Sequence, residues 1–301
     1  MATAAPAIPQ IAIGETVKIP AVGYGVGTAW FKAEGEKAEA LQKSISDALD
    51  AGFRHLDCAE CYQNDANTGK AVLAWLDKNG MKREDLHITD KVLSVDEGIE
   101  KICKKSLEVT GLQYFDLYLV HGPYMLDGTP FKKSLKEIWS EMEALYDSGL
   151  VKAIGVSNWR VSDLEEVWES ARIKPVVNQC EIHPYLQQPK LIKWCEEHQI
   201  VMAAYSPLSS LTQDSLKGGP VDEVVAKVAD RTGKSPTQVL LKMAYQLGYI
   251  VITTSSKPAR MAECLSMFDF DLTAEEISAI QAAGASAPQI RFYWKMMPID
   301  P

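Results

Sequence analysis

Short apolar segments alternate with longer amphipathic segments along most of the chain. The short segments are rich in aliphatic residues and are bounded by polar or turn-forming residues, which is typical of strands buried on both faces of a parallel sheet. The segments between them carry helix signals, so strands and helices are expected to alternate. The pattern predicts eight strands, at residues 22–26, 53–57, 86–92, 115–120, 151–156, 176–179, 200–205 and 249–253.

Several of the intervening segments begin with a signal for a helix start. A serine followed three residues later by a glutamate can satisfy the free backbone amides of the first helical turn, in an arrangement called a capping box. Residues 94–97 and 162–165 fit this pattern, and a threonine version opens a helix at 273–276. Ser235 is followed by Pro236, which is favoured at the first helical position because its missing N–H is no loss there.

Eight strand–helix units within about 250 residues match the (β/α)8 barrel in number and size. A doubly wound sheet is the alternative, but the glycines at 23–27 lack the spacing of its phosphate-binding loop. Residues 8–20 alternate around Gly14 and Glu15, which predicts a β-hairpin that caps the barrel floor. No interdomain linker stands out, so we expect one α/β barrel domain over residues 1–301.

The composition is that of a soluble globular protein, with 47% hydrophobic and 24% charged residues. A net charge of −9 argues against a nucleic-acid partner, because such proteins usually carry a basic face. The N-terminus lacks a secretory signal, and no segment is apolar enough to span a membrane. The six scattered cysteines favour reduced thiols and a cytoplasmic location. We expect a monomer, with a dimer as the alternative.

An acid, a lysine and a histidine stand at the ends of three successive predicted strands. They are Asp57, Lys91 and His121, and Tyr62 follows the acid by five residues. In a parallel barrel all strands end on the face that carries the chemistry of such enzymes. A nearby cation favours ionised tyrosine, so we expect Lys91 to make Tyr62 a better acid. Asp57 would hold the lysine charged and His121 would orient a carbonyl group, although an ordinary buried ion pair is the alternative.

Five motifs carry a resemblance to a known family. Residues 52–59, followed by Tyr62, resemble the first signature of the aldo-keto reductases, and residues 152–159, 178–185 and 204–208 are similar to later motifs. A weaker match follows the last predicted strand. The resemblance covers most of the chain and implies a (β/α)8 barrel that binds NADPH without a Rossmann fold and reduces a ketone or aldehyde.

The resemblance also implies roles for individual residues. Asp57, Tyr62, Lys91 and His121 match the catalytic tetrad of the family, with the tyrosine as proton donor. From the residues alone, the alternative is that Ser157 and Asn158 end a strand and that Tyr205 belongs to the core. The matches to cofactor-binding positions are Thr28 near the ribose, Ser157, Asn158 and Gln179 at the nicotinamide carboxamide, Tyr205 on the nicotinamide ring, and Ser206, Leu208 and Ser210 around the pyrophosphate.

The chain departs from the family pattern after its last predicted strand. Thr254 stands where a lysine usually meets the 2′-phosphate of NADPH. Ser255, Ser256, Lys257 and Arg260 follow within a few residues. A helix N-terminus can add its amides to an anion site, and the planar fork of arginine suits a phosphate. We therefore expect NADPH to be preferred over NADH, with Arg260 as the main anchor and Lys257 as the substitute for the missing lysine.

The physiological substrate is not determined by the sequence. An extra residue within 27–32 resembles a fungal branch of the family that acts on conjugated polyketones and α-keto amides. Candidate pocket residues are aromatic or soft, which suggests a flat or bulky carbonyl compound if they line the pocket. An aldose or sugar-acid reductase of the same family is the alternative. The candidates are Trp30, Tyr124, Met125 and Trp294.

Other classes of function remain open at this point. A strand-end lysine such as Lys91 can serve as the nucleophile of a Schiff-base aldolase, and a relative could bind the nucleotide without catalysing a reaction. His55, Cys58 and Cys61 have the spacing of metal ligands, but no second pair completes a zinc site, so no metal is expected. The two cysteines would make the protein sensitive to thiol reagents.

Overall fold

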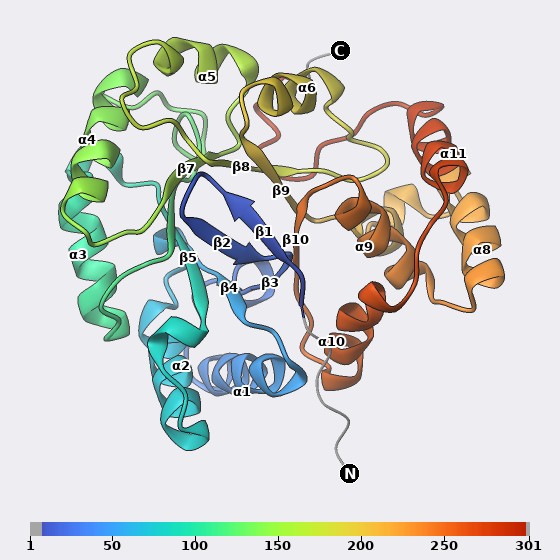
Figure 1. Cartoon of the computed structure of the whole chain (residues 1–301), viewed down its shortest axis with the longest axis horizontal. Coiled ribbons are helices and arrows are strands. Elements are labelled where there is room, and N and C mark those ends of the chain that lie inside the picture. The colour runs from blue at the N-terminus through green and yellow to red at the C-terminus, as the bar shows by residue number, and fades with distance from the viewer. Residues whose placement is uncertain (1–7, 299–301) are drawn as a thin grey trace.

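A closed barrel of eight parallel strands forms the centre of the molecule in the computed structural model, which describes residues 8–298. Each strand pairs with the next, and the last pairs with the first, so the predicted (β/α)8 barrel is confirmed (Figure 1). The strands are β3 (Val22–Gly25), β4 (His55–Asp57), β5 (His87–Val92), β6 (Leu117–Val120), β7 (Ile154–Ser157), β8 (Val177–Glu181), β9 (Val201–Tyr205) and β10 (Ile250–Thr253).

Helices lie around the barrel, and one short helix lies in the loop that follows β9 (Figure 1). They are α1 (Glu36–Ala51), α2 (Asp65–Asn79), α3 (Ile99–Thr110), α4 (Leu135–Asp147), α5 (Val161–Trp168), α6 (Pro189–Glu197), α7 (Ser209–Thr212), α8 (Pro220–Thr232), α9 (Pro236–Gln246), α10 (Pro258–Leu265) and α11 (Ala274–Ala285). Short 3-10 turns lie at η1 (Thr28–Trp30), η2 (Glu60–Tyr62), η3 (Arg83–Asp85), η4 (Val95–Glu97), η5 (Asp214–Leu216) and η6 (Ser266–Asp269). Within the described residues, no helix is both long and apolar enough to cross a membrane.

The predicted hairpin is present and closes one end of the barrel. It consists of β1 (Gln10–Ile13) and β2 (Val17–Pro20), which pair in antiparallel register. Ile13 and Ile19 are 1% exposed and pack against residues near the starts of the barrel strands, such as Leu117. The hairpin therefore buries the floor of the barrel, opposite the strand ends, as expected (Figure 1).

Two of the predicted helix starts are confirmed and two are wrong. The serine at 235 and the threonine at 273 each accept a backbone N–H from the third helical residue. Ser94 instead precedes the 3-10 turn η4, and α3 starts five residues later, after Gly98 with φ 97°. The helix predicted from Ser162 begins at Val161, because Asp163 accepts the N–H of the preceding Arg160 at 2.9 Å. The interaction between Arg160 and Asp163 thus replaces the predicted cap at Ser162.

Three predicted strands start too early. The strands predicted at 53–57, 115–120 and 151–156 begin two or three residues later in the structure. Phe53 and Phe115 are buried, at 1% exposure each, but Phe53 lies in an irregular segment before β4 and Phe115 forms only an isolated bridge with Val151 before β6. Apolar character alone does not distinguish such a buried segment from the strand that follows it.

Candidate active site

Alternation along β5 directs Lys91 to the barrel interior. Ile88 and Val92 face outward and join the core between the barrel and the helices. Thr89 and Lys91 point the other way, where they contact His55 and Asp57 on the neighbouring strand β4. Successive strand residues point to opposite sides, so the position of Lys91 follows directly from the strand register.

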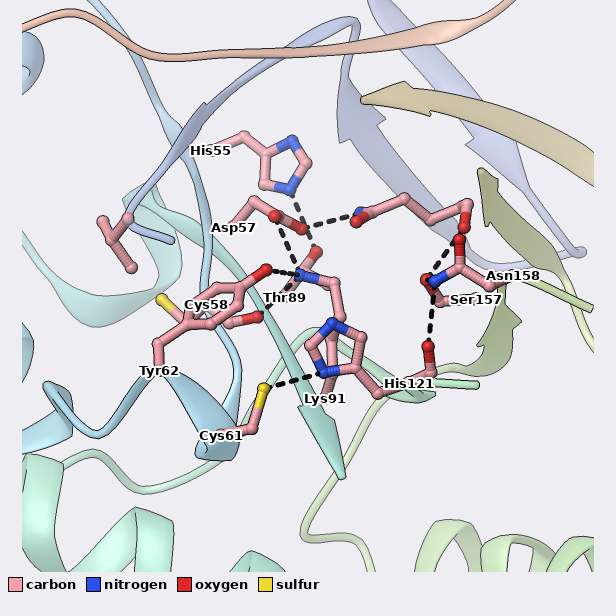
Figure 2. A network of polar contacts seen from close by, with 12 residues as sticks. His55, Asp57, Cys58, Cys61, Tyr62, Thr89, Lys91, His121, Ser157 and Asn158 are labelled. Atoms are coloured by element: carbon pink, nitrogen blue, oxygen red, sulfur yellow. Dashed lines mark hydrogen bonds and ion pairs between the residues drawn. The ribbon is translucent and has the colours of Figure 1, made fainter. Parts of the chain in front are cut away.

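Lys91 is the centre of a polar network at the strand ends (Figure 2). Its Nζ donates to Asp57 Oδ2 and to the Cys58 carbonyl, both at 2.8 Å, and lies 3.3 Å from the Tyr62 hydroxyl. Burial opposes the ammonium charge, but the attraction of Asp57 and Tyr62 outweighs it and raises the pKa of Lys91. Lys91 therefore stays positively charged and has three polar partners.

Tyr62 lies at the end of η2 and presents its hydroxyl to this lysine. Gly27 makes room for the ring, since a Cβ at that glycine would lie 2.7 Å from the ring. Burial raises the pKa of Tyr62 above its ordinary value, and the positive charge of Lys91 reduces this rise without cancelling it. Lys91 therefore makes Tyr62 a better acid than burial alone would allow, as expected, but burial outweighs this effect and the pKa of Tyr62 stays above its ordinary value. Tyr62 stays protonated across the neutral range.

His121 follows β6 directly and completes the group. Burial, followed by the charge of Lys91, lowers the pKa of His121 well below its ordinary value, so the ring is neutral. Its Nδ1 lies 3.3 Å from the sulfur of Cys61. The Tyr62 ring meets the imidazole edge to face, with 5.6 Å between the ring centroids (Figure 2). The structure therefore brings together all four residues that the strand ends predict.

A second polar group lies beside the first, at the ends of β7, β8 and β9. Asn158 has φ 59° and donates to the His121 carbonyl and to Ser157 Oγ, both at 3.0 Å. Its Oδ1 accepts from the Tyr205 hydroxyl at 2.8 Å. Gln179 donates to Asp57 Oδ1 at 2.7 Å, which connects the two groups. Among the described residues none donates a hydrogen bond to Gln179 Oε1, so this acceptor is free for a bound group.

A cavity of about 550 Å³ opens between the two polar groups. Its wall contains most of the predicted residues, whereas Lys91 lies behind it and is fully buried. Ser210 does not line the cavity, but it is 1% exposed and its Oγ has no hydrogen-bond partner among the described residues. The predicted residues in the wall are Thr28, Asp57, Tyr62, His121, Ser157, Asn158, Gln179, Tyr205, Ser206, Leu208 and Trp294.

The four residues predicted after the last strand lie just beyond the cavity, whose wall ends at Thr254. The Tyr24 hydroxyl donates to the Ser255 carbonyl at 2.8 Å, and this bond holds the loop against the barrel. Lys257 directly precedes α10 and Arg260 lies in the first turn of this helix, and both are exposed to solvent. Neither forms an ion pair with another described residue, and Ser256 is also exposed.

Three of the four predicted pocket residues do not line the cavity. Trp30 is 7% exposed and belongs to the core between barrel and helices. Its neighbour Phe31 reaches the cavity instead. Tyr124 and Met125 pack behind Trp294, which does line the cavity. Other wall residues that the sequence reasoning missed are Ala29, Leu126, Thr212 and Gln213.

The buried carboxylate of Glu181 holds the C-terminal segment at the cavity mouth. Glu181 is 0% exposed and accepts the backbone N–H groups of Phe292, at 3.0 Å, and Tyr293, at 2.9 Å. Phe292 and Tyr293 directly precede Trp294 in the chain. The Trp294 ring lies so close to Gly122 that a Cβ at this glycine would be 2.2 Å from the ring. The position of the aromatic wall therefore depends on one buried acid at the end of β8.

The cysteines near the site are not activated thiols. Burial raises the pKa of Cys58 well above its ordinary value and that of Cys61 to about 12. Sensitivity to thiol reagents stays a prediction, because Cys61 lines the cavity although its thiol keeps its proton at neutral pH. In the described part of the chain, no three His, Cys, Asp or Glu side chains are grouped in a way that could hold a metal ion.

Three comparisons with known proteins bear on this arrangement. The model of the aldo/keto reductase family matches residues 22–285. An "NAD/NADP-dependent indole-3-acetaldehyde reductase" of Schizosaccharomyces pombe is 41% identical over 89% of this chain and 92% of its own length. An "NADPH-dependent alpha-keto amide reductase" of Saccharomyces cerevisiae is 37% identical over 93% of this chain and 92% of its own length. The crystal structure of a Bombyx mori aldo-keto reductase in complex with NADP superposes with a TM-score of 0.84, at 29% identity over 92% of each chain.

Proposed function

The chain belongs to the aldo-keto reductase family, and from that membership we propose that it is an NADPH-dependent carbonyl reductase in which Tyr62 donates the proton. The observation that carries the proposal is the position of Lys91 Nζ, 2.8 Å from Asp57 and 3.3 Å from the Tyr62 hydroxyl. This ion pair adjoins a cavity that Tyr62 and His121 share with Ser157, Gln179 and Tyr205. One cavity thus contains both a proton donor and the groups suited to a nicotinamide.

The residues around the cavity fit an amide-bearing, phosphate-bearing cofactor. Gln179 retains a free acceptor oxygen, and Asn158 Oδ1 keeps one lone pair beyond the bond from Tyr205. The buried Ser210 hydroxyl has no partner among the described residues and suits a pyrophosphate oxygen. Lys257 and Arg260 remain the proposed anchors of a 2′-phosphate. When bound, NADPH supplies the two-electron reducing chemistry of its nicotinamide ring.

Tyr62, Lys91 and His121 stabilise the negative charge that develops on the substrate oxygen. The reaction turns a carbonyl oxygen into an alkoxide, which is a far stronger base than a phenolate, so a tyrosine with a raised pKa still transfers its proton favourably. As Tyr62 loses the proton, the Lys91 ammonium stabilises the phenolate, and Asp57 holds the ammonium in place. His121 is neutral and donates a hydrogen bond that orients the carbonyl group.

The same geometry disfavours the aldolase alternative. A Schiff-base lysine must be unprotonated and must reach the substrate. Lys91 is 0% exposed, lies behind the cavity wall, and has a raised pKa because Asp57 and Tyr62 outweigh its burial. It therefore serves as a charge and not as a nucleophile.

We propose a flat or bulky carbonyl compound as the substrate. Phe31, Leu126 and Trp294 contribute large apolar side chains to the wall beside Tyr62. The two fungal relatives are named for an indole aldehyde and for α-keto amides, which agrees with this preference. The family alternative is an aldose or sugar-acid reductase, whose substrate presents hydroxyl groups to the wall.

The test is NADPH oxidation by the purified protein with diketones, keto lactones, aromatic aldehydes and aldoses. The proposal predicts turnover of the aromatic and dicarbonyl compounds, with kcat/KM at least about tenfold above that for aldoses. A preference for aldoses would establish the sugar reductase alternative. NADPH binding without turnover of any compound would favour a non-catalytic relative.

Location and assembly are part of the same proposal. All six cysteines are free, which supports a reducing compartment, and we propose a cytoplasmic monomer. Cell fractionation and light scattering of the purified protein test these two points separately.

A further inference from the structure

Cys61 belongs to the group His55, Cys58 and Cys61, whose side chains have no role in the proposed reaction. It lies in η2, next to Tyr62, and lines the same cavity. Its sulfur is 3.3 Å from Nδ1 of His121, although 60 residues separate the two in the chain (Figure 2). This contact joins a thiol to the ring that faces the substrate.

The other nitrogen of His121 has no such partner. No described residue forms a hydrogen bond with Nε2, while the ring lines the cavity and the whole residue is only 7% exposed. Lys91 is the charged group beside the ring, and with burial it keeps the ring neutral. The Tyr62 and Trp294 rings lie against the imidazole, with centroid distances of 5.6 and 6.1 Å. Nε2 is therefore the atom of His121 left for a substrate.

A neutral imidazole carries its single proton on either Nδ1 or Nε2, and the partner of one nitrogen decides the state of the other. The thiol of Cys61 has a pKa of about 12 because burial opposes the thiolate, so it keeps its proton. A thiol sulfur is a weak acceptor, whereas an unprotonated imidazole nitrogen is a good one. The contact is therefore made by the S–H group donating to Nδ1, which leaves the ring proton on Nε2.

We propose that Cys61 is a positioning residue that holds His121 in the tautomer protonated at Nε2, so that the ring donates to a substrate carbonyl oxygen. The proposal deepens and rests on the carbonyl reductase function. With the opposite tautomer, an unprotonated Nε2 would face the carbonyl oxygen and repel it. Cys61 would thus act on substrate orientation through His121 and not by forming a covalent bond.

The direct test is ¹⁵N NMR of the full-length protein with labelled histidine. The chain has five histidines, and the His121→Asn variant identifies the signals of His121 by their loss. In the native protein we expect a pyrrole-like signal for Nε2 and a pyridine-like signal for Nδ1. Cys61→Ala removes the donor and should give a mixture of tautomers, whereas Cys61→Ser keeps a donor and should retain the native pattern.

Kinetics provide the second readout. Losing one neutral hydrogen bond should lower kcat/KM for para-nitrobenzaldehyde by about 2- to 10-fold in Cys61→Ala, and Cys61→Ser should restore it. Cys61→Val fills the volume without a donor and should behave like the alanine variant, which separates tautomer control from packing.

Two results would overturn the inference: a native His121 protonated at Nδ1, or an alanine variant with the native tautomer. Neither result bears on Tyr62 as the proton donor, because the tautomer of His121 decides only whether its Nε2 can donate to the carbonyl oxygen. Failure of the proposed function would instead appear as unimpaired turnover after loss of the Tyr62 hydroxyl.

Discussion

Replacing Lys91 with methionine should destabilise the fold as well as abolish turnover. The Lys91 side chain is 0% exposed and its partner Asp57 is 4% exposed, so the ion pair is fully desolvated. Methionine preserves most of the side-chain volume but leaves the Asp57 carboxylate with the amide of Gln179 as its one hydrogen-bond donor among the described residues. Removing one partner of a buried ion pair typically costs about 3–5 kcal/mol.

Urea unfolding followed by tryptophan fluorescence measures this loss. At about 2.1 cal/mol/K of unfolding entropy per residue, the same loss lowers the melting temperature of the 301-residue chain by about 5–8 °C. Lys43→Met is the matched control, because Lys43 pairs with Asp47 at the surface and its side chain is 72% exposed. That substitution should cost less than about 1 kcal/mol.

A double variant separates the buried charge from the lost packing. Asp57→Asn combined with Lys91→Met removes both charges and should recover about 2 kcal/mol relative to Lys91→Met alone, while remaining inactive. The reasoning would be refuted if Lys91→Met were as stable as Lys43→Met, or if the double variant were less stable than Lys91→Met.

Three further predictions concern the cofactor, the pocket and pH. Arg260→Ala should weaken NADPH binding by about 10- to 100-fold and leave NADH binding nearly unchanged in fluorescence titrations; equal weakening of both would exclude Arg260 as the phosphate anchor. Glu181→Ala removes the acceptor for the Phe292 and Tyr293 amides and should raise KM for a bulky aromatic substrate by at least about tenfold. Glu197 is exposed, so the control Glu197→Ala should leave this KM unchanged. An unchanged KM in Glu181→Ala would contradict the anchoring role. Because burial raises the pKa of Tyr62 and the protonated form is the donor, kcat for reduction should stay level from neutral pH to about pH 9, and a decline assigned to Tyr62 below that range would be inconsistent with the structure.

The barrel and the tetrad were predictable because they depend on local pattern and strand register. Asp57 and Lys91 end short apolar runs, and parallel strands in a closed barrel bring such ends together regardless of the intervening loops. The helix cap at Ser235 was also predictable, since both partners lie within one turn.

The errors arise where loop geometry or distant contacts decide. Trp30 and Phe31 are adjacent and both aromatic, and which of them reaches the cavity depends on a loop in which Thr28 has φ 29° and Lys32 has φ 50°. The bond from the Phe292 amide to Glu181 spans 111 residues, and no periodic pattern encodes it. The pKa of Tyr62 likewise depends on burial by the assembled site, which spacing alone does not reveal.

The most direct test of the central claim is the kcat of Tyr62→Phe with NADPH and para-nitrobenzaldehyde, measured beside the dissociation constant for NADPH. Phenylalanine retains the ring that packs against His121 but removes the hydroxyl near Lys91. Because general acid catalysis typically contributes about 10²–10⁴-fold, kcat should fall by that factor while NADPH binds as tightly as before. A variant that retains near-native kcat would show that Tyr62 is not the proton donor.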